Sequence, residues 1–234
     1  MLSAKTAAGN YFEDFAVGQV IRHATPRTLN SGDVALYQAL YGSRFAVQSS
    51  TAFARDIGYP DAPLDDLLVF HVVFGKTVPD ISLTAIANLG YADCRFLRPV
   101  FAGDTLTATS EVIGLRENSN KESGVVYVRS VGRNQRGEIV LEYARWVMVR
   151  KRDKAAQVAS AVVPQLPDRV APETLAAAVP AVNAYTYDRT LSGSDQLWSD
   201  YVPGERIDHL DGMTIEEAEH QMATRLYQNT AKLH

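Results

Sequence analysis

The sequence has little of several features that would point to a particular class of protein. It holds one cysteine, Cys94, in 234 residues, so an internal disulfide is excluded and a reducing compartment is favoured. The N-terminal segment lacks the apolar core of a signal peptide, and no window approaches the length of a membrane span. We therefore expect a cytoplasmic protein that has no membrane partner.

Metals, phosphate groups and nucleic acids also lack their usual sequence signals. No cluster of Cys, His and carboxylate residues has metal-ligand spacing, and no glycine-rich phosphate loop is present. The net charge is −4, and the basic run RKRDK at 150–154 is short, which is typical of a solvated strand end. The sequence therefore predicts neither a metal site nor a nucleic-acid partner.

The chain divides by composition into two blocks and a connecting segment. Residues 1–153 are rich in Val, Leu, Phe and Tyr, whereas residues 154–190 are dominated by Ala, Val and Pro. Recurrent prolines prevent a long helix, so 154–190 is predicted to be a linker or an arm laid over a surface. A second block occupies residues 191–234.

The first block predicts helices followed by a run of strands. Residues 30–42 place apolar side chains on one helical face, and residues 62–80 predict a helix that is apolar and buried on every side. Within it, His71 is interpreted as a hydrogen-bonded core histidine. β-branched and aromatic residues predict strands, the last two joined by a turn, at 104–115, 123–133 and 137–151. A buried helix followed by long antiparallel strands suggests an α+β fold in which a sheet curls around that helix.

The second block repeats the first at a constant offset of 186 positions, without gaps. The matching pairs are Asp14 and Asp200, Phe15 and Tyr201, Gly18 and Gly204, Ile21 and Ile207, His23 and His209, Thr28 and Thr214, Leu40 and Leu226, and Tyr41 and Tyr227. The ungapped register indicates a duplicated unit. His23 and His209 are interpreted as structural residues of corresponding strands.

The second copy predicts its own helix and then a short loop. Thr214 and Glu217 form a Thr-x-x-Glu capping box, and apolar residues follow at helical spacing from Ile215 to Leu226. The first copy continues for about 110 residues after its Leu-Tyr pair, so a complete second copy would require roughly 340 residues in total. We therefore expect the second copy to be incomplete in this sequence.

Several stretches of the first block resemble the MaoC-like hydratase/dehydratases, which have the hot-dog fold. They are FLRPVFAGDTLTATSEVIG at 96–114, DDLLVFHVVFGKTV at 65–78 and the NQRG turn. More narrowly, residues 64–100 resemble the mesaconyl-CoA hydratases (β-methylmalyl-CoA dehydratases), a double hot-dog family. The resemblance covers residues 11–152 and resumes at 196–234. It implies an antiparallel sheet wrapped around a central buried helix, present twice, with the second copy incomplete here.

The catalytic motif of this family is Asp-x4-His in the loop after the first helix. In the second copy Asn229 and His234 match its positions, whereas Ser43 and Gln48 match them in the first copy. Neither Ser43 nor Gln48 can act as a general base near neutral pH, so the first copy is expected to be inactive. Asp66 stands where active members carry a glycine whose amide faces the thioester oxygen, and its carboxylate would repel an oxyanion.

The resemblance also implies roles for individual side chains. An imidazole suits reversible proton transfer, so His234 is the expected acid and base, while Asn229 can orient a water but cannot take its proton. A neutral amide there avoids repulsion of a substrate carboxylate. Arg95, Arg98 and Asp66 are candidate substrate-binding residues, although an arginine beside a strand also suits a salt bridge.

These features leave three functional hypotheses. The first is a hydratase/dehydratase for an acyl-CoA such as mesaconyl-CoA or β-methylmalyl-CoA, with no cofactor beyond the coenzyme A of the substrate. The second is an acyl-CoA thioesterase that uses Asp65 or Asp66, and the third is a non-catalytic hot-dog binding module. Because a lone hot-dog sheet leaves an unpaired edge, we expect a homodimer or a higher homo-oligomer.

Overall fold

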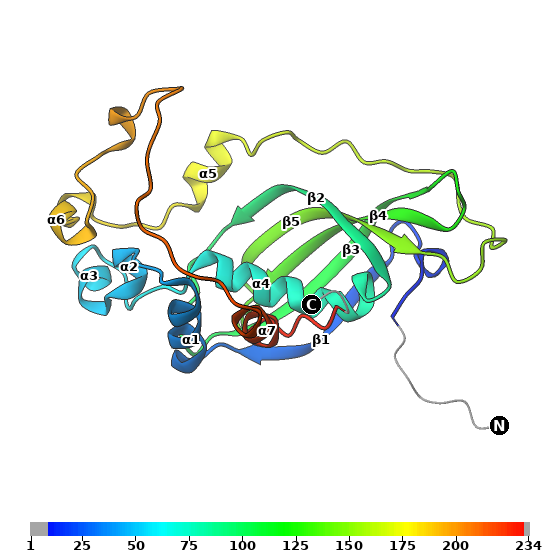
Figure 1. Ribbon diagram of the computed structural model, residues 1–234, viewed down its shortest axis with the longest axis horizontal. Coiled ribbons are helices and arrows are strands. Elements are labelled where there is room, and N and C mark those ends of the chain that lie inside the picture. Colours follow the sequence, from blue (N-terminus) through cyan, green and yellow to red (C-terminus); the bar gives the residue numbers. More distant parts are fainter. Residues whose placement is uncertain (1–8, 232–234) are drawn as a thin grey trace.

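The computed structural model describes residues 9–231 as a five-stranded antiparallel sheet with helices packed on it (Figure 1). The strand order is β1-β3-β4-β5-β2. The strands are β1 Val20–Thr28, β2 Ala85–Phe96, β3 Thr105–Glu117, β4 Ser123–Arg133 and β5 Ile139–Arg150. The helices of the first block are η1 Phe12–Asp14, α1 Ser31–Tyr41, α2 Ala46–Ser49, α3 Thr51–Asp56, α4 Asp66–Thr77 and η2 Val78–Ser82. The later helices are α5 Pro172–Ala178, η3 Ala184–Thr186, α6 Arg189–Ser192, η4 Trp198–Asp200 and α7 Glu217–Leu226.

Helix α4 lies across one face of the sheet, as the hot-dog fold requires (Figure 1). The carboxylate of Asp65 caps the helix by accepting a hydrogen bond from the Leu67 amide, at 2.8 Å. Four of its apolar side chains are buried against the strands, namely Leu68, Val69, Val72 and Val73. The expectation that the helix is buried on every side is wrong for Leu67, which is 55% exposed, because the sheet covers only one side of the helix.

Strands β3, β4 and β5 confirm the three strands expected from β-branched and aromatic residues. The turn between the last two is fixed by Asn134, whose side-chain oxygen accepts from the amides of Arg136 and Glu138 at 3.0 and 3.1 Å. Strand β2 was not predicted. Its sequence contains Asn88, Gly90 and Asp93, which are poor strand formers, and its register with β5 shifts several times.

The segment after β5 runs back past β2 to α5 (Figure 1). On the way, Val162 and Leu115 of β3 exchange backbone hydrogen bonds of 2.8 Å. The neighbouring Gly114 allows this approach, since a Cβ there would lie 2.5 Å from the carbonyl oxygen of Val162. The Ala- and Pro-rich segment is therefore attached to the sheet at this point.

The two ends of the chain adopt matching local structures 186 positions apart. Helices η1 and η4 correspond residue for residue, and Gly18 and Gly204 share a left-handed φ of 83° and 86°. Helix α1 begins at Ser31 after an Asn30 cap, and α7 begins at Glu217 after a Glu216 cap. These matches are the structural counterpart of the sequence repeat.

The capping box of α7 is displaced from the predicted one. Glu219 accepts from the Glu216 amide at 3.0 Å, whereas Thr214 lies before the helix and Ile215 is 82% exposed. The reason is the repeat itself, because Glu216 and Glu219 occupy the positions of the Asn30 and Asp33 box of α1. Threonine is the better capping residue, but Thr214 lies two positions before the N-cap position of α7.

Candidate functional site

The predicted catalytic loop follows α7, next to α4 (Figure 1). Its first residue, Gln228, has a left-handed φ of 54°, as Gly42 does after α1. The side-chain oxygen of Asn229 accepts a hydrogen bond from the Ala231 backbone amide at 3.1 Å, and the backbone amide of Asn229 donates to the Thr224 carbonyl at 2.9 Å. Asn229 lines an open hollow of about 450 Å³ beside α7. His234, the expected proton carrier, lies outside the described residues.

Tyr227, directly before this loop, is held by side chains of the first block. Its hydroxyl group donates to the hydroxyl group of Tyr41 at 2.7 Å, and its ring stacks on the His71 imidazole with centroids 4.4 Å apart. Burial, followed by the hydrogen bond to Tyr41, raises the pKa of Tyr227 above its ordinary value. Burial also lowers the pKa of His71. His71 therefore packs against the second block, and among residues 9–231 its ring is stacked instead of forming the hydrogen bond that was expected.

The corresponding loop of the first copy borders a cavity of about 390 Å³. Gln48 and the candidate substrate-binding residues Asp66 and Arg98 line it, together with residues of α5 such as Leu175. Burial, and secondarily the charge of Asp65, raises the pKa of the Asp66 carboxyl group. The structure thus brings Asp66 and Arg98 to one cavity, which the connecting segment partly closes.

The other arginine, Arg95, lies in an ion-pair cluster. Its guanidinium group is 3.0 Å from the Asp93 carboxylate and 2.8 Å from that of Glu142. Asp93 also pairs with Arg129 at 3.0 Å, and these arginines lower the pKa of Asp93 against the opposing effect of its burial. Arg95 does not line the cavity that contains Arg98.

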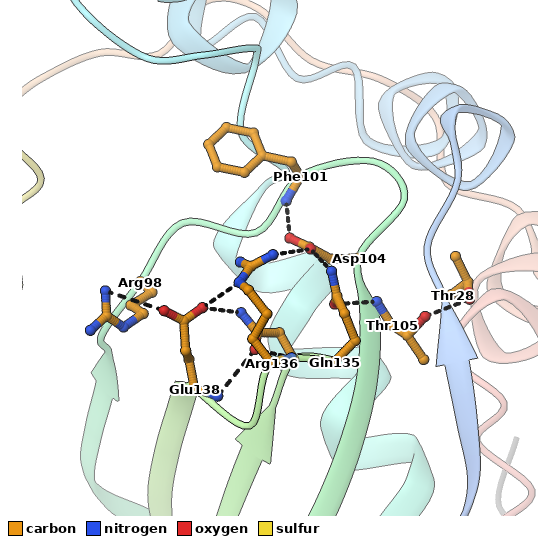
Figure 2. Close-up of polar contacts among 9 residues, drawn as sticks. Thr28, Arg98, Phe101, Asp104, Thr105, Gln135, Arg136 and Glu138 are labelled. Atoms are coloured by element: carbon orange, nitrogen blue, oxygen red, sulfur yellow. Dashed lines mark hydrogen bonds and ion pairs between the residues drawn. The ribbon is translucent and has the colours of Figure 1, made fainter.

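Asp104, from the GDTL segment that carries the family resemblance, organises two turns (Figure 2). Its carboxylate accepts from the Phe101 amide at 3.0 Å and from the Gln135 side chain at 2.6 Å. On the same side of the β4-β5 turn, Glu138 is 2.8 Å from Arg136 and 3.9 Å from Arg98. The motif residue Asp104 thus connects the start of β3 to the β4-β5 turn by hydrogen bonds, and these contacts bury its carboxylate.

Sequence reasoning overlooked two buried cations on the inner side of the sheet. Lys76 of α4 is 3% exposed and donates to the Thr25 carbonyl, and burial lowers its pKa to about 8. Arg145 is 1% exposed and lies 4.6 Å from the Phe74 ring centroid. The side chains of β5 alternate between the two faces of the sheet, and Arg145 lies on the inward face with Tyr143 and Val147. This alternation could have predicted that Arg145 is buried.

His23, interpreted from the sequence as structural, is buried between two polar partners. Its Nδ1 lies 2.7 Å from the Asp80 carboxylate and its Nε2 lies 2.8 Å from the Ser110 hydroxyl group. Burial lowers the pKa of His23, although Asp80 acts in the opposite direction. These contacts agree with the structural interpretation. Its repeat equivalent, His209, is exposed and lies in a segment without strand structure, so the structural interpretation is wrong for His209.

Among residues 9–231, no group of three or more His, Cys, Asp or Glu side chains could hold a metal ion. The helices within the same range are all too short or too polar to cross a bilayer.

Comparisons with known proteins agree on one family. The family described as mesaconyl-CoA hydratase matches residues 3–182. The chain is 63% identical to the β-methylmalyl-CoA dehydratase of Chloroflexus aurantiacus, over 100% of this chain and 66% of the relative. It is 59% identical to the mesaconyl-CoA hydratase of Cereibacter sphaeroides, over 98% of this chain and 67% of the relative. The chain thus spans about two thirds of the length of these relatives.

Solved structures confirm the fold class. A MaoC domain protein dehydratase from Chloroflexus aurantiacus superposes with a TM-score of 0.94 at 62% identity, over 99% of this chain and 66% of that one. A Mycobacterium tuberculosis protein described as having a double hotdog fold superposes with a TM-score of 0.72 at 26% identity, over 98% of this chain and 69% of that one. With its antiparallel sheet wrapped around α4 and its match to two highly similar relatives, the chain belongs to the mesaconyl-CoA hydratase family.

Proposed function

We propose that the protein is a hydro-lyase that adds water to, or removes it from, the α,β bond of an acyl-CoA. The observation that carries this proposal is the identity of 63% and 59% to proteins named β-methylmalyl-CoA dehydratase and mesaconyl-CoA hydratase. The substrate we assign is therefore mesaconyl-CoA or β-methylmalyl-CoA, a branched thioester with a free carboxylate. No cofactor beyond the coenzyme A of the substrate is required.

The catalytic groups we assign are Asn229 and His234. In hydration, His234 removes one proton from a water as the water oxygen bonds to the β-carbon. The same imidazole then delivers a proton to the α-carbon, so that H and OH are added to one face of the double bond. Asn229 orients the water by a hydrogen bond and leaves no negative charge beside the substrate carboxylate.

In the first copy we assign no proton transfer. Ser43 and Gln48 occupy the catalytic positions, and neither side chain is a general base near neutral pH. Asp66 and Arg98, which line the first-copy cavity, are proposed to contact the substrate, whereas Arg95 is proposed as a contact on the basis of its sequence position. In the structure, the guanidinium group of Arg95 pairs with Asp93 and Glu142.

A homo-oligomer and a cytoplasmic location complete the proposal. Strand β2 is one edge of the sheet, and its apolar side chains Ile86, Leu89 and Tyr91 are 38 to 41% exposed. An edge of this kind supports pairing with another sheet. The single cysteine supports a reducing compartment.

A thioesterase is the second candidate because two carboxylates, Asp65 and Asp66, lie at the N-terminal end of α4, where the family resemblance places the thioester oxygen. The full-length protein should be incubated with mesaconyl-CoA in the presence of a thiol reagent. We expect the absorbance of the enoyl thioester to fall while no free coenzyme A is released. Release of stoichiometric thiol would favour the thioesterase, and no change in either signal would favour a binding module.

A further inference from the structure

The end of α7 rests on the first block through groups of different chemistry. The guanidinium group of Arg27 donates to the Leu226 carbonyl, which is one of the carbonyl groups that a helix end leaves without an internal partner. The same guanidinium group is 2.6 Å from the Asp33 carboxylate, so its direction is fixed. A charged donor of restricted orientation therefore holds the last turn before the loop that carries Asn229.

Tyr227 provides the next two contacts. Its hydroxyl group is hydrogen-bonded to that of Tyr41 at 2.7 Å, and its ring lies nearly parallel to the His71 imidazole, at an interplanar angle of 21°. Tyr227 itself is 6% exposed. Because Asn229 lies only two residues further on, the backbone at the start of the loop has little freedom to move while these contacts persist.

Gly75 of α4 provides the last of these contacts with the end of α7. A Cβ atom on Gly75 would overlap the carbonyl oxygen of Tyr227, and it would lie 3.0 Å from the carbonyl carbon of Tyr227 and 3.4 Å from that of Gln228. Gly75 lies in the last turn of α4, which η2 extends without a break. Glycine disfavours a helix interior relative to alanine, so its presence there calls for a reason. The close approach of the Tyr227–Gln228 backbone is that reason.

We propose that Gly75, Tyr41 and His71 are positioning residues for the loop that carries Asn229. This inference rests on the proposed function. The first copy, which lacks a general base, then contributes to the reaction by fixing where the catalytic loop of the second copy lies. A displacement of about 1 Å in such a loop can reduce the rate roughly 100-fold, while binding of the remote coenzyme A moiety changes little.

The direct test is the Gly75→Ala variant of the full-length protein, assayed for hydration of mesaconyl-CoA. We expect kcat to fall by roughly 10- to 100-fold and KM to change much less. The matched control is Gly124→Ala in β4, where a Cβ would press against the Phe12 ring of η1. The control should lower thermal stability but leave kcat close to that of the wild type.

A milder test avoids a folding defect. Tyr41→Phe and Tyr227→Phe each remove one hydroxyl group of the same hydrogen bond, so each should lower kcat by roughly 2- to 10-fold. The double variant should be no worse than either single variant, because both substitutions remove one interaction. Tyr143→Phe is the control, because it removes the buried hydroxyl group of a tyrosine whose ring packs on Phe70 and Tyr91, and it should leave kcat unchanged.

The two proposals fail in different ways. A wild-type protein that does not hydrate mesaconyl-CoA refutes the proposed function. A wild-type protein that is active, with kcat unchanged in Tyr41→Phe and Gly75→Ala, refutes the positioning role alone. Equal loss of kcat in Gly75→Ala and Gly124→Ala refutes it too, because the loss would then follow from general destabilisation.

Discussion

The hydroxyl groups of Tyr41 and Tyr227 lie 2.7 Å apart, and the two residues are separated by 186 positions. This separation is the offset of the sequence repeat, so each tyrosine meets its own counterpart. Contact between equivalent residues is what a local twofold relation between two copies produces. The loops that begin after Tyr41 and after Tyr227 therefore extend from a shared point, one with Ser43 and the other with Asn229 at the matching position.

The identity of residue 229 should determine the preference for dicarboxylic thioesters. Asn229→Asp introduces a negative charge beside the substrate carboxylate, and like charges repel strongly in a site that excludes water. We expect KM to rise for mesaconyl-CoA more than for crotonyl-CoA, which has no free carboxylate. Steady-state kinetics on both substrates provide the measurement, and an equal rise in both KM values would contradict the explanation.

His234 should be essential, whereas its counterpart in the first copy should not. Loss of a general acid and base costs roughly 100- to 10,000-fold in rate, so His234→Ala should reduce kcat by that order. Gln48→Ala alters the equivalent position of the first copy and should retain most of the activity. Comparable losses in the two variants, each shown to be folded by circular dichroism, would contradict the assignment of chemistry to the second copy.

Lys76 predicts a pH dependence of stability. Its pKa falls from 10.5 to about 8 through burial and, secondarily, the charge of Arg27, so the unfolded chain binds more protons than the folded protein between these pH values. The contribution of Lys76 to the unfolding free energy therefore rises with pH from about 8 to 10.5. Below this range the folded protein bears the full free-energy cost of burying the charged Lys76 ammonium group.

The measurement for Lys76 is urea unfolding of the wild type and of Lys76→Met across that pH range. The difference in unfolding free energy between the two proteins should shift in favour of the wild type as pH increases. Lys154→Met, at a lysine whose side chain is 69% exposed, is the control and should show a constant difference. A constant difference for Lys76→Met as well would show that the folded protein keeps this lysine charged.

Asp104 should contribute to stability rather than to catalysis. Asp104→Ala removes two hydrogen bonds that the carboxylate accepts, from the Phe101 amide and the Gln135 side chain, and each such bond contributes about 0.5 to 1.5 kcal/mol net, or about 1 to 3 kcal/mol for the pair. We expect a lower unfolding free energy by that amount, measured in urea, with kcat nearly unchanged. A large loss of kcat in a stably folded variant would instead assign this motif residue to the active site.

The sequence predicted the parts of the fold that have a strong local composition. Strands β3, β4 and β5 have β-branched residues throughout, and α4 has a long apolar segment after the Asp65 cap. Strand β2 was not predicted, because Asn88, Gly90 and Asp93 interrupt it and its stability comes from pairing with β5. Such pairing depends on residues about 50 positions away and leaves no local pattern.

The candidate site was predictable in its position but not in its surroundings. The repeat and the family motif placed Asn229 and His234 in the loop after α7, and that assignment remains a prediction. The contacts of Tyr227 with His71 and Gly75 arise only when two segments distant in sequence pack together. The sequence left Arg95 as either a substrate contact or a salt-bridge partner, and the fold places two carboxylates against it.

The most direct test of the proposed reaction is the fate of the water oxygen. The full-length protein should be incubated with mesaconyl-CoA in water enriched in oxygen-18, and the products analysed by mass spectrometry. A hydro-lyase predicts an intact thioester that is heavier by one water and carries the label as a hydroxyl group on the β-carbon. Free coenzyme A together with label in a carboxylate would contradict the account, because water would then have attacked the thioester carbonyl instead.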